Sequence, residues 1–399
     1  MAEEPPAAFG DSVSDYAAAP RRRGLRTGFT TGTCAAAAAK AACLALGGDR
    51  PAMIPLRVPA GVIINVPVHS FSVASGRARA SVIKDAGDDP DVTHGAEIGV
   101  EVSLGEGGGR LRPGWQVIGE GLVACRLARG SVIELAAGPG VGVVTRRGLG
   151  IPVGGPAINP VPRRMIAAAV RQGLNYLTSR VRVEVFVTDG EKLAQRTLNA
   201  RLGVVGGLSI LGTTGIVRPY STASWRASAL QGVDVAAAAA VSTVVASTGG
   251  RSEKYAHARY PDLPEVAFVE MGEFTGHVLR RARERGIPQV VLAGMIGKLS
   301  KIASGHFMTH VAGNQVDPIY LADVAFRAGA TADVVAAAGK VNTARHAQEL
   351  ILEAGLPRFF SIVCEDARRR CQELVGSLPE VGVLLFDFDG RLLGSAGDA

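Results

Sequence analysis

A turn rich in glycine and threonine runs directly into an alanine-rich stretch at residues 25–46, LRTGFTTGTCAAAAAKAACLAL. Alanine is the best helix former and Thr33 is a favoured N-cap residue, so we expect a helix from about Cys34 to Leu46, where a Gly-Gly pair ends it. A helix N-terminus with free N–H groups binds anions. An ordinary capped helix remains the alternative, but four threonines in seven residues exceed what one cap needs and favour an anion site.

The length and composition favour a globular protein of two domains. A chain of 399 residues exceeds one ordinary core, and 47% apolar residues with 51 glycines are typical of a globular protein with many tight turns. The apolar runs are too short for a membrane span, and residues 1–23 have the composition of a disordered tail. Five scattered cysteines are typical of reduced thiols, so we expect a cytoplasmic protein.

The excess of basic residues predicts an anionic partner. The formal net charge is +7, and the isoelectric point is about 9.4. The arginines form short clusters at 21–23, 146–147 and 163–164 with few aromatic residues nearby, whereas a nucleic-acid surface needs aromatic side chains for stacking. Arginine pairs suit a small molecule with several carboxylates, although solubility explains any single pair. We expect a small-molecule ligand and neither nucleic acid nor a membrane.

The sequence pattern changes near residue 180. Before it, alternating β-branched residues broken by Pro and Gly are typical of antiparallel strands, and a long loop at 138–162 precedes a predicted helix at 163–174. After it, short apolar runs alternate with helical stretches, as in a parallel sheet with helices on both faces. These runs lie at 181–187, 208–211, 242–247, 265–270 and 288–294. Residues 381–393 predict a closing hairpin.

We therefore expect a tail at 1–23, a β-rich α+β domain at 24–180 and a Rossmann-like, mostly parallel α/β domain at 181–399. Ligands of such parallel sheets bind at the carboxyl ends of the strands. Four loops rich in glycine or threonine should lie there, at 188–190, 212–215, 247–250 and 294–297.

A second unusual segment, VIKDAGDDPDVTHG at 82–95, places four aspartates beside a threonine and a histidine. Crowded carboxylates raise one another's pKa, so that one can act as a base. The spacing does not match a calcium loop, and an ordinary turn explains two of these aspartates better than four. Asp85 or His94 is the candidate proton acceptor.

Other candidate motifs are weaker. His306 and His310 have a zinc-compatible spacing without a third ligand, so we expect no metal site and favour a hydrogen bond or a structural role. The DFDG segment at 387–390 is interpreted as a hairpin turn. Cys34 could have a lowered pKa at a helix start or could simply pack there. No dinucleotide, Walker A or serine-hydrolase motif occurs.

Four segments together resemble the CbiD family, the cobalt-precorrin-5B C1-methyltransferases of cobalamin biosynthesis. The matching motifs lie at 25–42, 82–95, 155–166 and 186–221, in the same order. The resemblance implies methyl transfer from S-adenosylmethionine to C-1 of cobalt-precorrin-5B, giving cobalt-precorrin-6A, with cobalt present only as part of the substrate. The family differs in fold from the usual tetrapyrrole methyltransferases, so their cofactor motifs are not carried over.

The predicted roles follow from this resemblance and from the residue types. Asp85 and His94 are the predicted catalytic residues. The predicted substrate contacts are Thr27, Thr30, Thr31, Gly32, Thr33, Asp88, Asn159, Arg163, Arg164 and His310. The predicted cofactor contacts are Thr188, Asp189, Gly190, Gly206, Gly207, Gly212, Thr213, Thr214 and Gly215, because glycine permits close backbone approach. The reverse assignment of the two pockets stays open, as does a homo-oligomer.

Two other functions remain open at this point. A nicotinamide-dependent corrinoid reductase lacks its usual dinucleotide motif here, and a non-catalytic corrinoid-binding protein would hold the ring without binding the methyl donor. RNA methylation is a more distant alternative, which salt-dependent RNA binding would reveal.

Overall fold

The computed structural model describes residues 24–105, 111–126, 131–174, 180–309 and 317–397. Its first half is built on a seven-stranded sheet in the order β4-β5-β6-β12-β9-β8-β7. These strands are β4 (Ser70–Ala74), β5 (Arg77–Ile83), β6 (Glu97–Gly105), β7 (Gln116–Gly119), β8 (Leu122–Arg126), β9 (Val132–Ala137) and β12 (Arg180–Val187). Neighbours are antiparallel except β9 and β12, which run parallel. The predicted β-rich, mostly antiparallel N-terminal half is confirmed.

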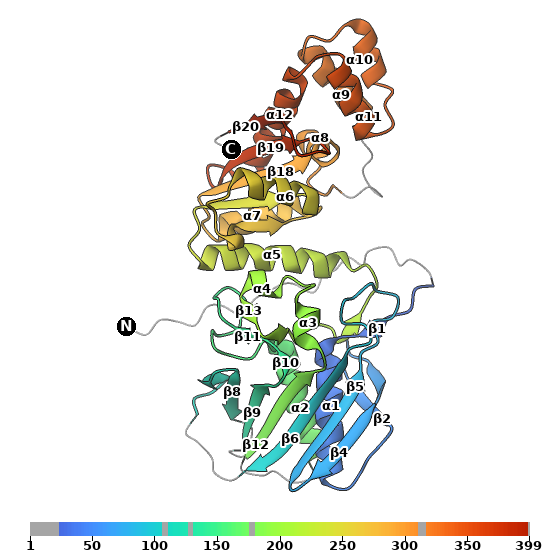
Figure 1. Cartoon of the computed structure of the whole chain (residues 1–399), viewed down its shortest axis with the longest axis vertical. Coiled ribbons are helices and arrows are strands. Elements are labelled where there is room, and N and C mark those ends of the chain that lie inside the picture. The colour runs from blue at the N-terminus through green and yellow to red at the C-terminus, as the bar shows by residue number, and fades with distance from the viewer. Residues whose placement is uncertain (1–23, 106–110, 127–130, 175–179, 310–316, 398–399) are drawn as a thin grey trace.

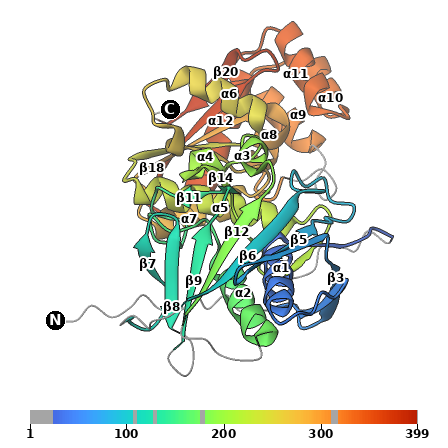
Figure 2. The same ribbon diagram turned by 60° about the horizontal axis from the view of Figure 1, so that its bottom comes forward.

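Two helices, α1 (Thr31–Leu46) and α2 (Pro160–Gly173), pack side by side against this sheet (Figure 2). The alanines at 35–39 are fully buried, because small side chains let α1 approach the sheet and α2 together. Gly173 permits the closest approach, since a Cβ there would lie 2.6 Å from Cys43 Cβ. The alanine run is therefore the tightly packed centre of this unit.

Short strands connect the N-terminal segments to residues far along the chain. The hairpin of β2 (Met53–Arg57) and β3 (Ile63–Pro67) lies beside α1. β1 (Gly28–Phe29) pairs with β15 (Ile216–Val217), β10 (Gly140–Val141) with β14 (Gly207–Leu208), and β11 (Val143–Val144) with β13 (Val204–Val205). The short helices α3 (Gly190–Ala194) and α4 (Asn199–Leu202) follow β12.

The second half is a five-stranded sheet in the order β17-β16-β18-β19-β20. Its strands are β16 (Thr243–Ser247), β17 (Phe268–Glu270), β18 (Gln289–Met295), β19 (Glu380–Phe386) and β20 (Leu392–Ala396). All pairs are parallel except β19 and β20, which form the predicted closing hairpin. The predicted mostly parallel sheet is thus confirmed for this half.

Helices cover both faces of the second sheet. α6 (Gly250–Arg259) packs on one face, while α5 (Thr222–Ala238), α7 (Thr275–Glu284), α8 (Ile296–Ala303) and α12 (Arg358–Val375) pack on the other. The turn η3 (Glu265–Ala267) precedes β17, and α9 (Pro318–Arg327), α10 (Ala332–Ala338) and α11 (Ala344–Glu353) lie between α8 and α12. In Figure 1, α5 lies between the two sheets. Within the described residues, no helix is both long and apolar enough to cross a membrane.

Three predictions about these elements are wrong. The 181–187 strand, expected in the second sheet, is β12 in the middle of the first, because β6 and β9 flank it. The four Gly/Thr loops therefore do not meet at one sheet edge: two belong to each unit. The helix α1 begins at Thr31 rather than Cys34, because the Thr30 side chain accepts the Thr33 N–H and caps it.

We propose that the two units meet near residue 221, where α5 begins, rather than at 180. Arg201 of α4 joins them, donating to Glu253 of α6 at 2.6 Å and to Glu265 at 3.0 Å. The Arg201–Glu253 pair is largely buried, and it holds α4, near the end of the first unit, against α6.

Candidate active site

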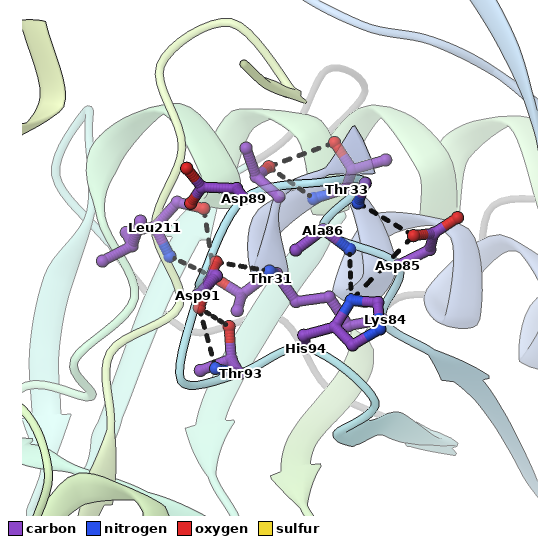
Figure 3. Close-up of polar contacts among 12 residues, drawn as sticks. Thr31, Thr33, Lys84, Asp85, Ala86, Asp89, Asp91, Thr93, His94 and Leu211 are labelled. Carbon is purple, nitrogen blue, oxygen red and sulfur yellow. Dashed lines mark hydrogen bonds and ion pairs between the residues drawn. The ribbon is translucent and has the colours of Figure 1, made fainter. Parts of the chain in front are cut away.

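Several predicted segments meet at one end of the seven-stranded sheet, where α1 begins. The Phe29 amide donates to the Asp85 carbonyl at 2.8 Å, and the Gly32 amide donates to the Leu211 carbonyl at 3.0 Å. We call this assembly the loop cluster (Figure 3). It consists of residues 26–33, 84–97 and 209–217. The cluster thus joins the threonine turn, the aspartate loop and one of the glycine-threonine loops.

The threonines at the start of α1 are bonded within the protein. Thr31 donates its hydroxyl to the Leu211 carbonyl at 3.1 Å and accepts the Leu211 amide at 2.8 Å. The Thr33 hydroxyl donates to the Gly215 carbonyl at 2.8 Å, and Thr30 is the N-cap. All three threonines are buried. In this conformation the Thr31 and Thr33 hydroxyls fix the 209–217 segment to the helix start, and the Thr30 hydroxyl caps the helix, so the case for an anion site on these hydroxyls is weakened.

The carboxylates of the aspartate loop each have a partner. The Arg26 guanidinium forms an ion pair with Asp85, while the Arg26 amide donates to Asp88 at 2.6 Å. The Tyr220 amide donates to Asp89 at 2.8 Å. The hydrogen bond from Arg26 holds the pKa of the Asp85 carboxyl below its usual value. The expectation that crowding raises these pKa values is wrong for Asp85, because its nearest charge is a cation.

A buried lysine holds the far side of the same loop. Lys84 follows β5 and continues its inward-facing positions, and only 1% of its side chain is exposed. Its ammonium group donates to Asp91 at 2.6 Å, and Asp91 also accepts from the Thr93 amide and hydroxyl (Figure 3). Burial acts to raise the pKa of Asp91, but Lys84 and these hydrogen bonds outweigh it and lower that pKa.

His94 lies beside Asp85, and its ring is half exposed. Its Nδ1 accepts the Ala86 amide at 3.1 Å and is 4.0 Å from Asp85 Oδ1. A neutral imidazole whose Nδ1 accepts a hydrogen bond carries its proton on Nε2. A neutral His94 bonded to Ala86 in this way therefore carries its N–H donor on Nε2.

The predicted substrate contacts on α2 fall into two groups. Asn159 is the N-cap residue of α2, and its backbone N–H donates to the Ile210 carbonyl. Arg163 is buried, and its guanidinium donates to the Ile158 and Pro156 carbonyls. Burial lowers the pKa of Arg163 to about 10. Arg164 is exposed and lines a hollow of about 440 Å³ with Arg57 and Thr213. Of the predicted pair, Arg164 is exposed at this hollow and Arg163 supports the backbone.

The glycines of the predicted cofactor loops mostly pack against other backbone. A Cβ on Gly190 would lie 2.2 Å from the Gly140 carbonyl oxygen, and one on Gly207 would lie 2.3 Å from Gly140. A Cβ on Gly212 would lie 2.4 Å from the Thr30 hydroxyl oxygen, and one on Gly215 would lie 2.6 Å from Val58 Cβ. Gly206 has a positive φ of 85° in an open turn. The protein itself therefore explains these glycines, so they no longer argue for an approaching cofactor.

The remaining predicted residues lie at the surface or outside the described chain. Thr188 bonds Glu97 at 2.8 Å, Asp189 bonds Lys192 at 2.8 Å, and Thr214 bonds the Ile216 carbonyl at 3.0 Å. Thr27 forms an isolated bridge with Gly87. His310 lies outside the described residues, so its predicted contact cannot be placed.

Cys34 is fully buried, and burial raises the pKa of its thiol to about 12, which fits packing rather than reactivity.

Sequence reasoning missed Lys84, Arg26 and Arg57. Lys84 had a usable signal, because Ala78, Ala80 and Val82 alternate inward along β5 and the lysine occupies the next inward position. A lysine there needs a carboxylate, and the loop supplies one within a few residues. Arg26 and Arg57 are exposed arginines without a comparable pattern.

The comparisons with known proteins agree on one family. The family model described as CbiD matches residues 18–219, and a second one, described as CbiD, C-terminal domain, matches residues 308–397. The chain belongs to the CbiD family. The cobalt-precorrin-5B C(1)-methyltransferase of Salinispora arenicola is 48% identical, covering 94% of this chain and 93% of its own. Its Thermus thermophilus counterpart is 46% identical, covering 94% and 96%.

A solved structure of the same CbiD family also matches. It is the 1.9 Å crystal structure of the cobalamin biosynthesis protein (cbiD) from Archaeoglobus fulgidus, which is 27% identical. The match covers 71% of this chain and 81% of that one, with a TM-score of 0.37.

Proposed function

We propose that this chain transfers a methyl group to C-1 of cobalt-precorrin-5B in cobalamin biosynthesis, with S-adenosylmethionine as the methyl donor. Two findings support this proposal. The chain belongs to the CbiD family, and relatives named for this activity align with it over nearly their whole length. The substrate is a cobalt corrinoid fringed with acetate and propionate groups, so its binding site must combine an apolar surface with cations.

The hollow beside α2 is the structural observation that supports a corrinoid as the substrate. Arg57 and Arg164 lie at it, and its remaining lining is mostly apolar. Its volume of about 440 Å³ accommodates an edge of a large ring, with the two guanidinium groups placed for peripheral carboxylates. Thr213 joins this hollow to the loop cluster, because residues 212–215 contact the start of α1.

In the loop cluster, Asp85 and His94 take different roles. Asp85 is paired with Arg26, which lowers its pKa, makes it a weak base and links the loop to residue 26. His94 accepts the Ala86 amide at Nδ1, which leaves Nε2–H on this half-exposed ring as a hydrogen-bond donor to a carboxylate or carbonyl of the corrinoid. We propose that His94 binds and orients the substrate and that Asp85 positions the loop that carries His94.

When bound, S-adenosylmethionine supplies an electrophilic methyl group on a sulfonium. Transfer is a displacement at that carbon, so the protein contributes mainly by holding the ring carbon in line and by excluding water. The arginines, His94 and the loop cluster hold the corrinoid in a fixed orientation for this displacement. Carboxylates near the sulfonium further stabilise its positive charge.

The direct test is an anaerobic incubation of the purified chain with cobalt-precorrin-5B and S-adenosylmethionine carrying a ¹³C-labelled methyl group. We expect a corrinoid heavier by one methyl, with the label at C-1 by NMR, and stoichiometric S-adenosylhomocysteine. Tight ring binding without methylation would instead support a corrinoid carrier. Activity that requires a nicotinamide cofactor would support the reductase.

A further inference from the structure

The second sheet has a strand order in which the direction of winding reverses at one point. Numbered along the chain, its strands follow the order 2-1-3-4-5, with β16 first, β17 on one side and β18 on the other. The connection through α6 covers one face and the connections through α7 and α8 cover the opposite face. In such sheets, ligands bind at the carboxyl ends of the two strands where the winding reverses. Here these strands are β16 and β18.

The loop that follows β16 contains two glycines that neither the backbone conformation nor packing against other residues requires. Gly249 has a φ of 165°, which any residue adopts, and a Cβ on Gly249 or Gly250 would meet nothing within 4 Å. Among the described glycines, only these two combine open space with an unexceptional φ. The glycines of the first unit behave differently, because backbone or side chains fill the space at most of them. Close approach by a ligand accounts for Gly249 and Gly250.

An acidic residue lies at the position where nucleoside-binding sheets contact a ribose. Glu270 ends β17, lies level with Ser247 at the end of β16, and is exposed. It follows the Gly-Gly loop by about 20 residues, the spacing at which nucleoside-binding sheets carry the carboxylate that accepts from ribose hydroxyls. The loop and the carboxylate come from adjacent strands and face the same sheet edge.

Unpartnered buried hydroxyls lie at the same edge. Ser247 is fully buried at the end of β16 and Thr275 at the start of α7, and neither hydroxyl has a hydrogen-bond partner within the described residues. The Thr309 amide bonds the Glu273 carbonyl in the β17–α7 loop, and the Thr309 hydroxyl is likewise unpartnered and buried. Buried polar groups normally have partners, so these hydroxyls are an independent indication of a ligand.

A cation completes this edge. Lys298, on α8 directly after β18, donates to the carbonyls of Thr248 and Gly272, at the ends of β16 and β17. Burial lowers the pKa of this lysine, and Glu273 and Glu270 counteract that shift. The edge therefore offers a carboxylate for hydroxyls and an ammonium group for a carboxylate.

We propose that the carboxyl edge of the second sheet, built from Gly249, Gly250, Glu270 and Lys298, binds the adenosyl and carboxylate ends of the methyl donor. This rests on the proposed function. It moves the donor away from the 188–190 and 206–215 loops, where sequence analysis placed it, and leaves the first unit to the corrinoid. Glu270 accepts from the ribose hydroxyls, and Lys298 binds the carboxylate of the amino-acid part.

The test measures binding of S-adenosylhomocysteine to the full chain by calorimetry, without turnover. Gly249→Ala/Gly250→Ala should leave the melting temperature unchanged, because the added methyls have room, while it weakens binding by about tenfold or more. Glu270→Gln should weaken binding by about tenfold, and Glu380→Gln, at the amino edge of the same sheet, should have no effect.

A double-mutant cycle assigns the ribose contact. The 2′-deoxyribose analogue of S-adenosylhomocysteine should bind wild type about tenfold more weakly, with no further loss in Glu270→Gln. Normal affinity in both second-sheet variants, with lost affinity in Asp189→Asn, would overturn this site. A wild type that binds and methylates while the variants bind normally refutes only the site. A wild type that neither binds nor methylates refutes the proposed function as well.

Discussion

Lys84 Nζ lies 2.6 Å from Asp91 Oδ2, although the lysine side chain is almost completely buried. The same carboxylate accepts from the Thr93 amide and hydroxyl, so three donors converge on one aspartate. The pair ties the end of β5 to the middle of the aspartate loop and thereby sets the position of His94, three residues further on.

Removing the buried cation should destabilise the protein strongly. In Lys84→Met, Asp91 keeps its charge but loses its partner in a mostly buried setting, so we expect the free energy of unfolding to fall by about 3 kcal/mol. Urea unfolding followed by circular dichroism measures it. Lys84→Met/Asp91→Leu should recover most of this loss, and Asp88→Asn, at an exposed position, should change little. An additive double variant would show that the two residues are not coupled.

The same pair should make stability sensitive to acid. Because the folded-state pKa of Asp91 is lowered, its contribution is fully present above the unfolded pKa of about 4 and is lost as pH falls through the folded value. Wild type should therefore lose more stability than Asp91→Asn between about pH 6 and about pH 3. Melting temperatures across this range test it, and parallel curves for the two proteins contradict it.

Thr31 should prove to be a structural residue. Thr31→Val keeps the shape but leaves the Leu211 amide without its acceptor, so we expect a loss of about 1–3 kcal/mol in unfolding free energy. Thr213→Val, which alters an exposed hydroxyl, is the matched control for the unfolding free energy. If Thr31→Val instead unfolds like wild type while the KM for the corrinoid rises, the hydroxyl binds substrate and the anion-site hypothesis is restored.

His94 should carry its proton on Nε2 when neutral. Two-dimensional ¹H–¹⁵N spectra of the imidazole distinguish the two tautomers, and an Nδ1–H form would contradict the Ala86 contact. His94→Asn should keep the acceptor for Ala86 and thus the melting temperature, while lowering kcat/KM by about a hundredfold through loss of the outer donor. His94→Gln, whose longer amide can reach outward, should retain more activity than His94→Asn.

The sequence predicted much of the architecture because local patterns dominate it. Alanine content located α1, alternation indicated several strands of the first half but not β6, β7 or β8, and the apolar runs at 242–247 and 288–294 located β16 and β18. It misplaced β12, although residues 180–185 of this strand alternate charged residues with buried valines, a pattern typical of a sheet with one exposed face such as the first. The apolar residues at 185–187 and the position of the strand at the change of pattern favoured the second sheet instead.

The candidate site was predicted in part. The threonine turn, the aspartate loop and residues 212–215 do come together, but the sequence could not show that the threonines bond to Leu211 and Gly215. Glycines were equally ambiguous, since Gly190 and Gly249 look alike in sequence. A Cβ meets a carbonyl at Gly190 and open space at Gly249, and that distinction depends on tertiary contacts.

The pairing of β1 with β15 has a consequence for synthesis of the chain. Residues 28–29 are among the first of the fold to leave the ribosome, yet their partners are residues 216–217, more than halfway along the chain. The start of α1 and the aspartate loop therefore reach their final contacts only after residues 216–217 have been synthesised. A nascent chain shorter than this leaves the start of α1 and the aspartate loop without these contacts, and chaperone binding should peak at that stage of translation.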